Sequence, residues 1–153
     1  MKKIMLFIGT IVFWFGWPVL WIYFRNSRRT RLLLICGDEF LALRGWIGAG
    51  NWVLTGGGFH RGENSLDGLI REVREETGIT ITNKQPRLLF TETYHEYGLS
   101  FDYDCYMVQL AEKPKINVQR FEIADYSWQS MNSPTVKLGA DGKEALRQWL
   151  SKS

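Results

Sequence analysis

Residues 57–79 read GGFHRGENSLDGLIREVREETGI, and this stretch predicts a glycine-containing loop that leads into one amphipathic helix. Asn64 or Ser65 can cap the amino end of the helix, and Gly78 is placed to end it after Thr77. Apolar side chains recur at the spacing that forms one core-facing stripe: Leu66, Leu69, Ile70 and Val73. We therefore expect a helix from about Ser65 to Thr77 with one buried face.

Three glutamates of this helix gather on one flank, directly beside the core stripe. At about 100° per residue from Leu66, Glu72 lies at about 240°, Glu75 at about 180° and Glu76 at about 280°. Like charges at i and i+4 repel, more strongly where water is excluded, and the carboxyl end of a helix disfavours anions. Hard divalent cations remove this conflict, so the pattern predicts bound Mg²⁺, with Mn²⁺ as an alternative.

The glycines and one arginine complete a site around these carboxylates. Gly57 and Gly58 let the backbone approach a metal ion and phosphates without a Cβ clash, and they can expose a carbonyl ligand. Arg71, at about 140° on the helix, can reach Glu75 or Glu63 and hold a carboxylate in one rotamer. The planar guanidinium suits this orienting role better than a lysine would.

The joint pattern resembles the Nudix box, Gx5Ex7REUxEExGU with U aliphatic, at every defined position from Gly57 to Ile79. The resemblance implies an α/β/α sandwich around a mixed sheet. The apolar amino-terminal segment, described below, adds one transmembrane helix before this domain. It also implies hydrolysis of a nucleoside diphosphate linked to another moiety, by attack of activated water on phosphorus. The implied metal ligands are the Gly57 carbonyl, Glu72, Glu75 and Glu76.

The same resemblance gives roles to residues around these ligands. Glu63 and Arg71 would orient the carboxylates, and Gly57, Gly58 and Tyr97 would contact a nucleotide-derived substrate. Tyr97 loosely resembles the tyrosine of dinucleoside-polyphosphate hydrolases. Several acidic residues are candidates for the general base: Glu72 and Glu76 within the box, and Glu122, Asp125, Glu92 and Glu96 outside it.

Two positions depart from the usual pattern of the family. Thr55 stands where many members have proline, and Gly68 stands where alanine is common. We expect neither residue to touch the chemistry. A non-catalytic nucleotide-binding module of the same fold is the alternative to an enzyme, although the intact carboxylate set argues against it. Isopentenyl-diphosphate isomerase chemistry is disfavoured because neither Cys36 nor Cys105 fits the required acid–base thiol.

The rest of residues 31–153 predicts strands and one further helix. Arg31–Cys36 and Glu39–Leu43 form a hairpin across Gly37-Asp38, with both cysteines as free thiols in strands. The other predicted strands are Trp52–Leu54, Leu88–Tyr94, Phe101–Leu110 and Ala124–Gln129. A terminal helix over Asp141–Ser151 should turn four side chains inward: Ala145, Leu146, Trp149 and Leu150.

Residues 4–24 contain no charged side chain, and as a helix they would reach about 32 Å, the thickness of one bilayer core. A cleaved signal peptide is disfavoured because the apolar run is long and no Ala-x-Ala site follows. We expect residues 1–30 to form a single-pass membrane anchor that contacts the lipid bilayer through residues 4–24. Four arginines follow this segment, so the positive-inside tendency places the catalytic domain, residues 31–153, in the cytoplasm.

The charge is also unevenly placed. The chain has 19 cations and 16 anions, but residues 1–31 hold six of the cations and none of the anions. Residues 32–153 therefore carry 13 cations against 16 anions. The positive charge of the whole chain is therefore no evidence for a basic face on this part, and we expect no nucleic-acid polymer as a partner.

Overall fold

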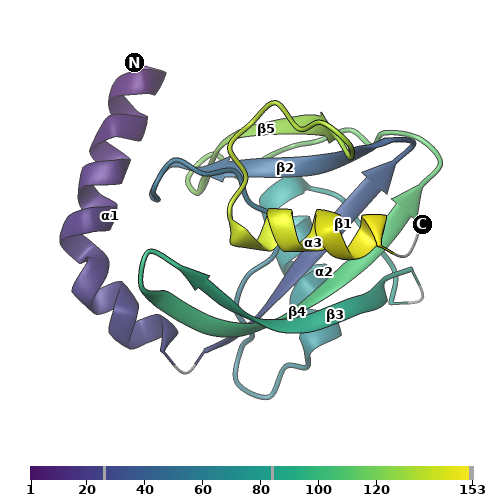
Figure 1. Ribbon diagram of the computed structural model, residues 1–153, viewed down its shortest axis with the longest axis horizontal. Coiled ribbons are helices and arrows are strands. Elements are labelled where there is room, and N and C mark those ends of the chain that lie inside the picture. The colour runs from purple at the N-terminus through teal and green to yellow at the C-terminus, as the bar shows by residue number, and fades with distance from the viewer. Residues whose placement is uncertain (26, 84, 152–153) are drawn as a thin grey trace.

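A five-stranded mixed sheet forms the centre of the protein in the computed structural model, which describes residues 1–25, 27–83 and 85–151. The strands lie in the order β3-β4-β1-β2-β5 (Figure 1). Only the β1–β4 pair runs parallel among these neighbours, and the other three pairs are antiparallel. The strand bounds are β1 Arg28–Cys36, β2 Glu39–Gly45, β3 Arg87–Glu96, β4 Leu99–Leu110 and β5 Ile123–Ser130.

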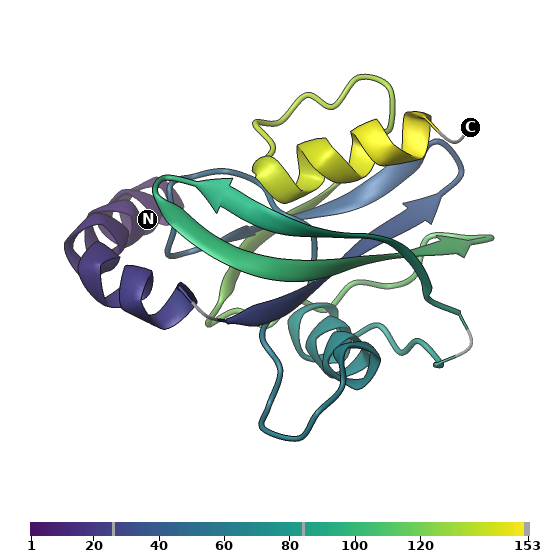
Figure 2. The ribbon, with the colours of Figure 1, turned by 60° about the horizontal axis from the view of Figure 1, so that its bottom comes forward.

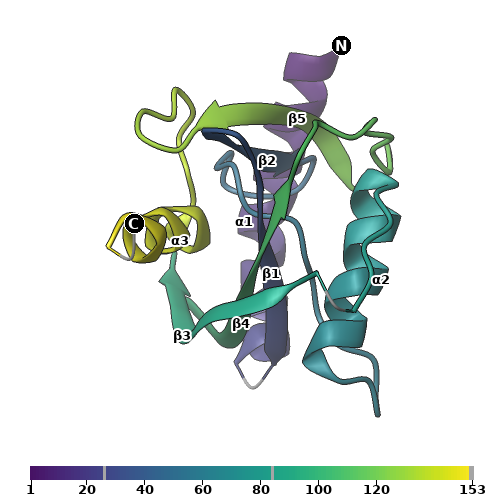
Figure 3. The same ribbon diagram turned by 90° about the vertical axis from the view of Figure 1, so that its right-hand side faces the viewer.

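Two helices cover opposite faces of this sheet, as Figures 2 and 3 show for α2 (Ser65–Thr77) and α3 (Ala140–Leu150). Each face has its own apolar core, because successive side chains of β1 point to opposite sides. The core under α2 includes Leu32, Leu34, Leu69 and Val73. The core under α3 includes Leu33, Ile35, Ala145 and Leu146. The predicted α/β/α sandwich around a mixed sheet is therefore confirmed.

The bounds of α2 match the prediction from its capping residues. The Asn64 side chain accepts a hydrogen bond from the Asp67 backbone N–H at 2.9 Å, and Gly78 ends the helix with a left-handed φ of 73°. Gly68 permits close packing inside the helix, since a Cβ there would lie 3.1 Å from the Phe59 ring.

Most of the other predicted elements are confirmed, with two exceptions. The hairpin of β1 and β2 forms, but β1 begins at Arg28 because residues 28–30 extend its pairing with β4. Residues 52–54 make only isolated bridges, so the strand predicted there is wrong. In α3 the prediction for Leu150 is wrong, because this last helical residue is half exposed. Both cysteines are free thiols in strands, as predicted.

The amino-terminal helix α1 (Lys2–Phe24) lies beside the sandwich, next to the turn that joins β3 and β4 (Figures 1 and 2). Its length and composition suffice to cross a membrane, as do those of many signal sequences and buried core helices. Only Gly9 and Phe13 are buried in α1. Most of its large apolar side chains are exposed.

Candidate active site

Arg71 of α2 is the centre of a network that fixes three carboxylates and one loop. Its guanidinium donates twice to Glu63, both times at 3.0 Å, and once to the Gly58 carbonyl at 2.9 Å. It also donates to Glu72 at 2.8 Å and to Glu75 at 3.1 Å. The hydrogen bonds from Arg71 lower the pKa of Glu63 to about 2, so this carboxylate stays ionised and holds its partner in place.

Glu72 lies against the glycine loop that precedes α2. A Cβ on Gly57 would be 2.6 Å from Glu72 Oε1, so any other residue there would displace the carboxylate from this position. Glu72 lines a cavity of about 250 Å³, which we call the carboxylate cavity. Its other lining residues are Tyr23, Arg29, Gly56, Gly57, Gly58, Phe59, His60, Glu76 and Glu122.

Glu76 is the deepest carboxylate of this cavity. It accepts hydrogen bonds from the Thr55 hydroxyl at 2.6 Å and from the Gly56 backbone N–H at 2.9 Å. Burial raises the pKa of Glu76 to about 7, although these two donors and Arg31 oppose the rise. Without a bound cation, Glu76 is therefore partly protonated near neutral pH.

Two arginines of β1 bring positive charge to the same place. Arg31 donates to the Gly56 carbonyl at 2.6 Å and to Asp141 of α3 at 3.0 Å, so it ties the glycine loop to the opposite helix. Burial lowers the pKa of Arg29 to about 10, which leaves it cationic at neutral pH. The Nε of Arg29 is buried without a hydrogen-bond partner among the described residues.

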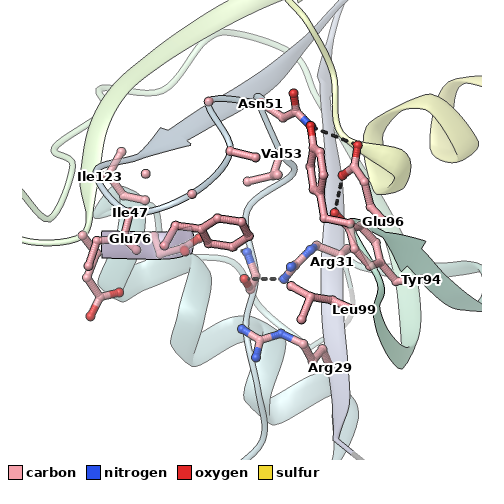
Figure 4. A pocket seen from close by; sticks show the side chains of 18 residues that line it. Arg29, Arg31, Ile47, Asn51, Val53, Glu76, Tyr94, Glu96, Leu99 and Ile123 are labelled. Atoms are coloured by element: carbon pink, nitrogen blue, oxygen red, sulfur yellow. Dashed lines mark hydrogen bonds between the residues drawn. The ribbon is translucent and has the colours of Figure 1, made fainter. Parts of the chain in front are cut away.

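A second cavity of about 290 Å³, which we call the aromatic cavity, adjoins the first (Figure 4). Arg29, Gly56, Glu76 and Glu122 line both cavities. Its further lining residues include Phe13, Arg31, Asn51, Tyr94, Glu96 and Tyr97. Asn51 donates to Glu96 at 2.9 Å and to the Tyr97 hydroxyl at 3.1 Å. The described site thus joins carboxylates, a guanidinium and aromatic rings in adjoining spaces.

Comparison with known proteins identifies the family of this chain. Residues 25–150 match the model of the NUDIX domain. This chain belongs to the Nudix hydrolase family. A Bacillus subtilis relative, the uncharacterized Nudix hydrolase YvcI, is 44% identical over 69 residues, which are 42% of this chain and 40% of the relative. The aligned part thus spans less than half of that protein.

Solved structures share the fold of this Nudix domain. A MutT NUDIX hydrolase from Burkholderia pseudomallei superposes with a TM-score of 0.72 at 20% identity, covering 80% of this chain and 97% of the other. The NUDIX domain of Shewanella oneidensis NrtR, complexed with ADP ribose, superposes with a TM-score of 0.71 at 16% identity. That match covers 83% of this chain and 88% of the other.

Nudix hydrolases generally use divalent metal ions, and the donors of the carboxylate cavity suit one. Within residues 1–25, 27–83 and 85–151, no group of three or more His, Cys, Asp or Glu side chains forms a ready-made metal site. The reason is visible in the contacts, because Arg71 holds Glu72 and Glu75 while Thr55 holds Glu76. Mg²⁺ needs only one or two carboxylates beside water and phosphate oxygens, and Glu72 and Glu76 line one space.

The structure separates the predicted site residues into two groups. Gly57, Gly58, Glu72 and Glu76 line the carboxylate cavity, and Tyr97 lines the aromatic cavity. Glu75 lines neither of these cavities, because its half-exposed carboxylate turns to Arg71. Glu63 and Arg71 pair with each other, as the helix geometry predicted.

The candidate bases outside the box also separate. Glu122 lines both cavities, and Glu96 lines the aromatic cavity, where the Tyr94 hydroxyl donates to it. Asp125 pairs with Lys2 and Arg44. Glu92 lies away from the two cavities, beside Arg147 of α3.

Several residues of the site were missed or misjudged at the level of sequence. Arg29 belongs to the basic stretch that we assigned to the membrane anchor, but it lines both cavities. Arg31 was expected only to begin the predicted hairpin, but it lines the aromatic cavity. The expectation that Thr55 does not touch the chemistry is wrong, because its hydroxyl binds Glu76. Gly68 lies beside the network, since a Cβ added there would be 3.3 Å from Glu63 Oε2. The sequence feature that could have indicated a role for Arg29 was its positive charge at the start of a buried strand.

Proposed function

We propose that this chain is a Mg²⁺-dependent hydrolase that cleaves the pyrophosphate linkage of a nucleoside diphosphate joined to another moiety. The observation that carries the proposal is the shared space of Glu72, Glu76 and the Gly57 backbone, with the Arg29 guanidinium at its junction with the aromatic cavity. Carboxylates there would hold Mg²⁺, and Arg29 would bind phosphate oxygens. A substrate with a diphosphate and a planar base suits such a pair of cavities.

The protein's own residues would prepare this reaction in a defined way. Bound Mg²⁺ supplies charge stabilisation for the phosphoryl oxygens and lowers the pKa of a coordinated water. Arg71 keeps Glu72 in one rotamer, and Thr55 and Gly56 orient Glu76 toward its place beside the glycine loop. We assign the general base to Glu122, which lines both cavities and is not one of the proposed ligands.

The test uses the full chain in detergent with Mg²⁺ against nucleotide sugars, ADP-ribose, dinucleoside polyphosphates and oxidised nucleoside triphosphates. We expect Glu72→Gln and Glu76→Gln to lower kcat/KM at least about 100-fold, since several kcal/mol of charge stabilisation are lost. Glu112→Gln is the matched control, because this exposed glutamate lies outside both cavities. Glu122→Gln should lower kcat without changing the affinity for Mg²⁺.

Two outcomes would contradict the proposal. Either the wild-type chain turns over no compound of the panel, or Glu72→Gln and Glu76→Gln match the Glu112→Gln control. Binding of a nucleotide without turnover would instead favour the non-catalytic module that shares this fold.

We also propose that residues 4–24 attach the enzyme to a bilayer, with the Nudix domain on the cytoplasmic side. The apolar length of α1 and the arginines that follow it support this orientation. A Glu112→Cys chain should sediment with membranes and react with an impermeant maleimide only after the cells are opened. Reaction in intact cells would contradict the cytoplasmic placement, and a soluble chain would contradict the attachment.

A further inference from the structure

One stripe of α1 packs on the Nudix domain, and the opposite side does not. The buried or half-buried residues lie on one side of the helix: Leu6, Gly9, Thr10, Phe13, Gly16, Trp17, Leu20 and Phe24. Their spacing is that of one helical face. The other side exposes large apolar residues, including Phe7, Ile8, Phe15, Val19 and Ile22. The helix therefore has a docked face and a free apolar face.

The docked face touches the loop that borders the aromatic cavity. A Cβ on Gly9 would overlap the Trp46 carbonyl, so the helix backbone lies directly against the loop backbone. Ile47, Gly48, Ala49 and Gly50 of this loop line the aromatic cavity. By contrast, a Cβ on Gly16 of the same helix would meet nothing within 4 Å. The close backbone contact is thus at Gly9 and not at the half-buried Gly16.

Phe13 and Trp17 join the helix to Tyr97. The Phe13 ring is 8% exposed, lines the aromatic cavity and lies 6.4 Å from the Tyr97 ring, edge to face. Trp17 Nε1 donates to the Tyr97 carbonyl at 2.8 Å. Tyr97 and Gly98 both have positive φ, 53° and 75°, in the turn between β3 and β4. Because a tyrosine rarely adopts this backbone, the bond from Trp17 helps to hold it there.

We infer that α1 is part of the substrate site, and that Phe13 and Tyr97 form the wall against which the base of the nucleotide rests. This rests on the proposed function, and it adds Phe13, a substrate-contacting residue from outside the Nudix box. The aromatic cavity contains rings that suit a planar base, and it opens to Arg29 and Glu76 of the phosphate side. A nucleoside diphosphate likewise has a planar base at one end and phosphates at the other.

The docked position of α1 and a bilayer-crossing position are alternatives for the same helix. Lys2 pairs with Asp125 of β5 at 2.8 Å, and the Phe24 ring lies 5.4 Å from Phe101 of β4. The domain thus contacts α1 at both ends of the helix. A helix that crossed the bilayer would carry Lys2 away from Asp125 and Phe13 away from Tyr97. Substrate binding, which needs this wall, should therefore favour the docked helix.

The test compares two variants with two matched controls in the full chain. Phe13→Ala removes the wall, and Gly9→Ala pushes the helix from the loop without altering any cavity side chain. Phe15→Ala and Gly16→Ala change the same residue types on α1, where Phe15 is 84% exposed and Gly16 has open space. The probe is 8-azido-ADP with Mg²⁺, photolysed and mapped by mass spectrometry, together with KM for the best substrate of the panel.

We expect the probe to label residues 1–25 in wild type and in both controls. Phe13→Ala and Gly9→Ala should weaken labelling and raise KM by about 5- to 100-fold, with a smaller change in kcat. Labelling confined to residues beyond 25, or equal KM in all four variants, would overturn the inference while leaving the hydrolase intact. A wild-type chain without turnover would refute the hydrolase instead, and labelling would still report on α1. The thermal unfolding temperature of each variant shows whether the variant has lost only the aromatic wall or the folded structure as well.

Discussion

The helices α1 and α2 differ in what holds them in place. Beside its buried apolar face, polar contacts within about fifteen residues fix the ends and the charged flank of α2, through the cap at Asn64, the left-handed Gly78 and the reach of Arg71 to Glu63. Apolar contacts with distant parts of the chain fix α1, through Gly9 on Trp46 and Phe13 on Tyr97. The position of a helix with many charged residues thus depends partly on specific local hydrogen bonds and ion pairs. The position of an apolar helix depends on whichever apolar surface or apolar solvent it contacts.

The difference matters because both helices border the same pair of cavities. The network of α2 would set the metal and the chemistry, and the docked face of α1 would set the nucleotide wall. Disturbing α2 should therefore change kcat and metal dependence. Disturbing α1 should change KM, and the size of this change should depend on the membrane environment.

The largest expected effect concerns the buried charge of α2. The pKa of Glu76 is about 7 in the folded protein because of burial, against 4.5 as the ordinary value. The folded state therefore keeps a proton that the unfolded chain releases. Without metal, the stability from this group is complete below pH 4.5 and is lost as the pH rises toward 7, by about 3 kcal/mol. No comparable loss should come from α1, which has no charged residue between positions 4 and 24.

Urea unfolding in EDTA at about pH 5 and pH 8 measures this slope. Glu76→Gln should reduce the slope and stabilise the metal-free chain at the higher pH. Glu75→Gln is the control, because the half-exposed Glu75 lies outside the cavity and should leave the slope unchanged. An identical slope in wild type and Glu76→Gln would show that Glu76 does not titrate in this range.

The next effect in size concerns the orienting role of Arg71. Arg71→Lys keeps the positive charge but cannot reproduce the simultaneous bonds to Glu63, Gly58 and Glu72. We expect kcat/KM to fall about 10- to 100-fold, as is usual when a group that orients metal ligands is lost. Steady-state kinetics at saturating Mg²⁺ measure the fall.

Arg74→Lys makes the same substitution on an exposed position of the same helix. It should leave kcat/KM within about twofold of wild type. If both variants lost activity equally, the effect would come from helix stability, and the contrast between a positioning arginine and a surface arginine would fail.

The two helices also differ in how much of their structure could be predicted from the sequence. The bounds of α2, its stripe and the pairing of Arg71 with Glu63 follow from helix periodicity and capping, so they were predictable. The roles of Arg29 and Thr55 depend on contacts between β1, the glycine loop and α2, which no local pattern encodes. The spacing of α1 residues was compatible with a membrane span, since a helix apolar on every side gives no signal of its docked face.

The smallest effect concerns the ion pair at the start of α1. Lys2 and Asp125 are both partly exposed, so their pair is worth about 0.2–1 kcal/mol. Lys2→Ala should therefore raise KM only about 1.5- to 5-fold, by weakening the docking of α1. In about 0.5 M NaCl this difference should disappear, because salt screens exposed charges.

Lys3→Ala is the matched control, since Lys3 is also an exposed amino-terminal cation but has no ion pair in the structure as described. A rise in KM for Lys2→Ala alone, abolished by salt, would mean that α1 is docked along its full length while substrate binds. An equal rise for both variants would mean that general positive charge matters, as expected for a helix end at an anionic bilayer surface. The weakest contact of α1 thus distinguishes a helix that belongs to the active site from one that only anchors it.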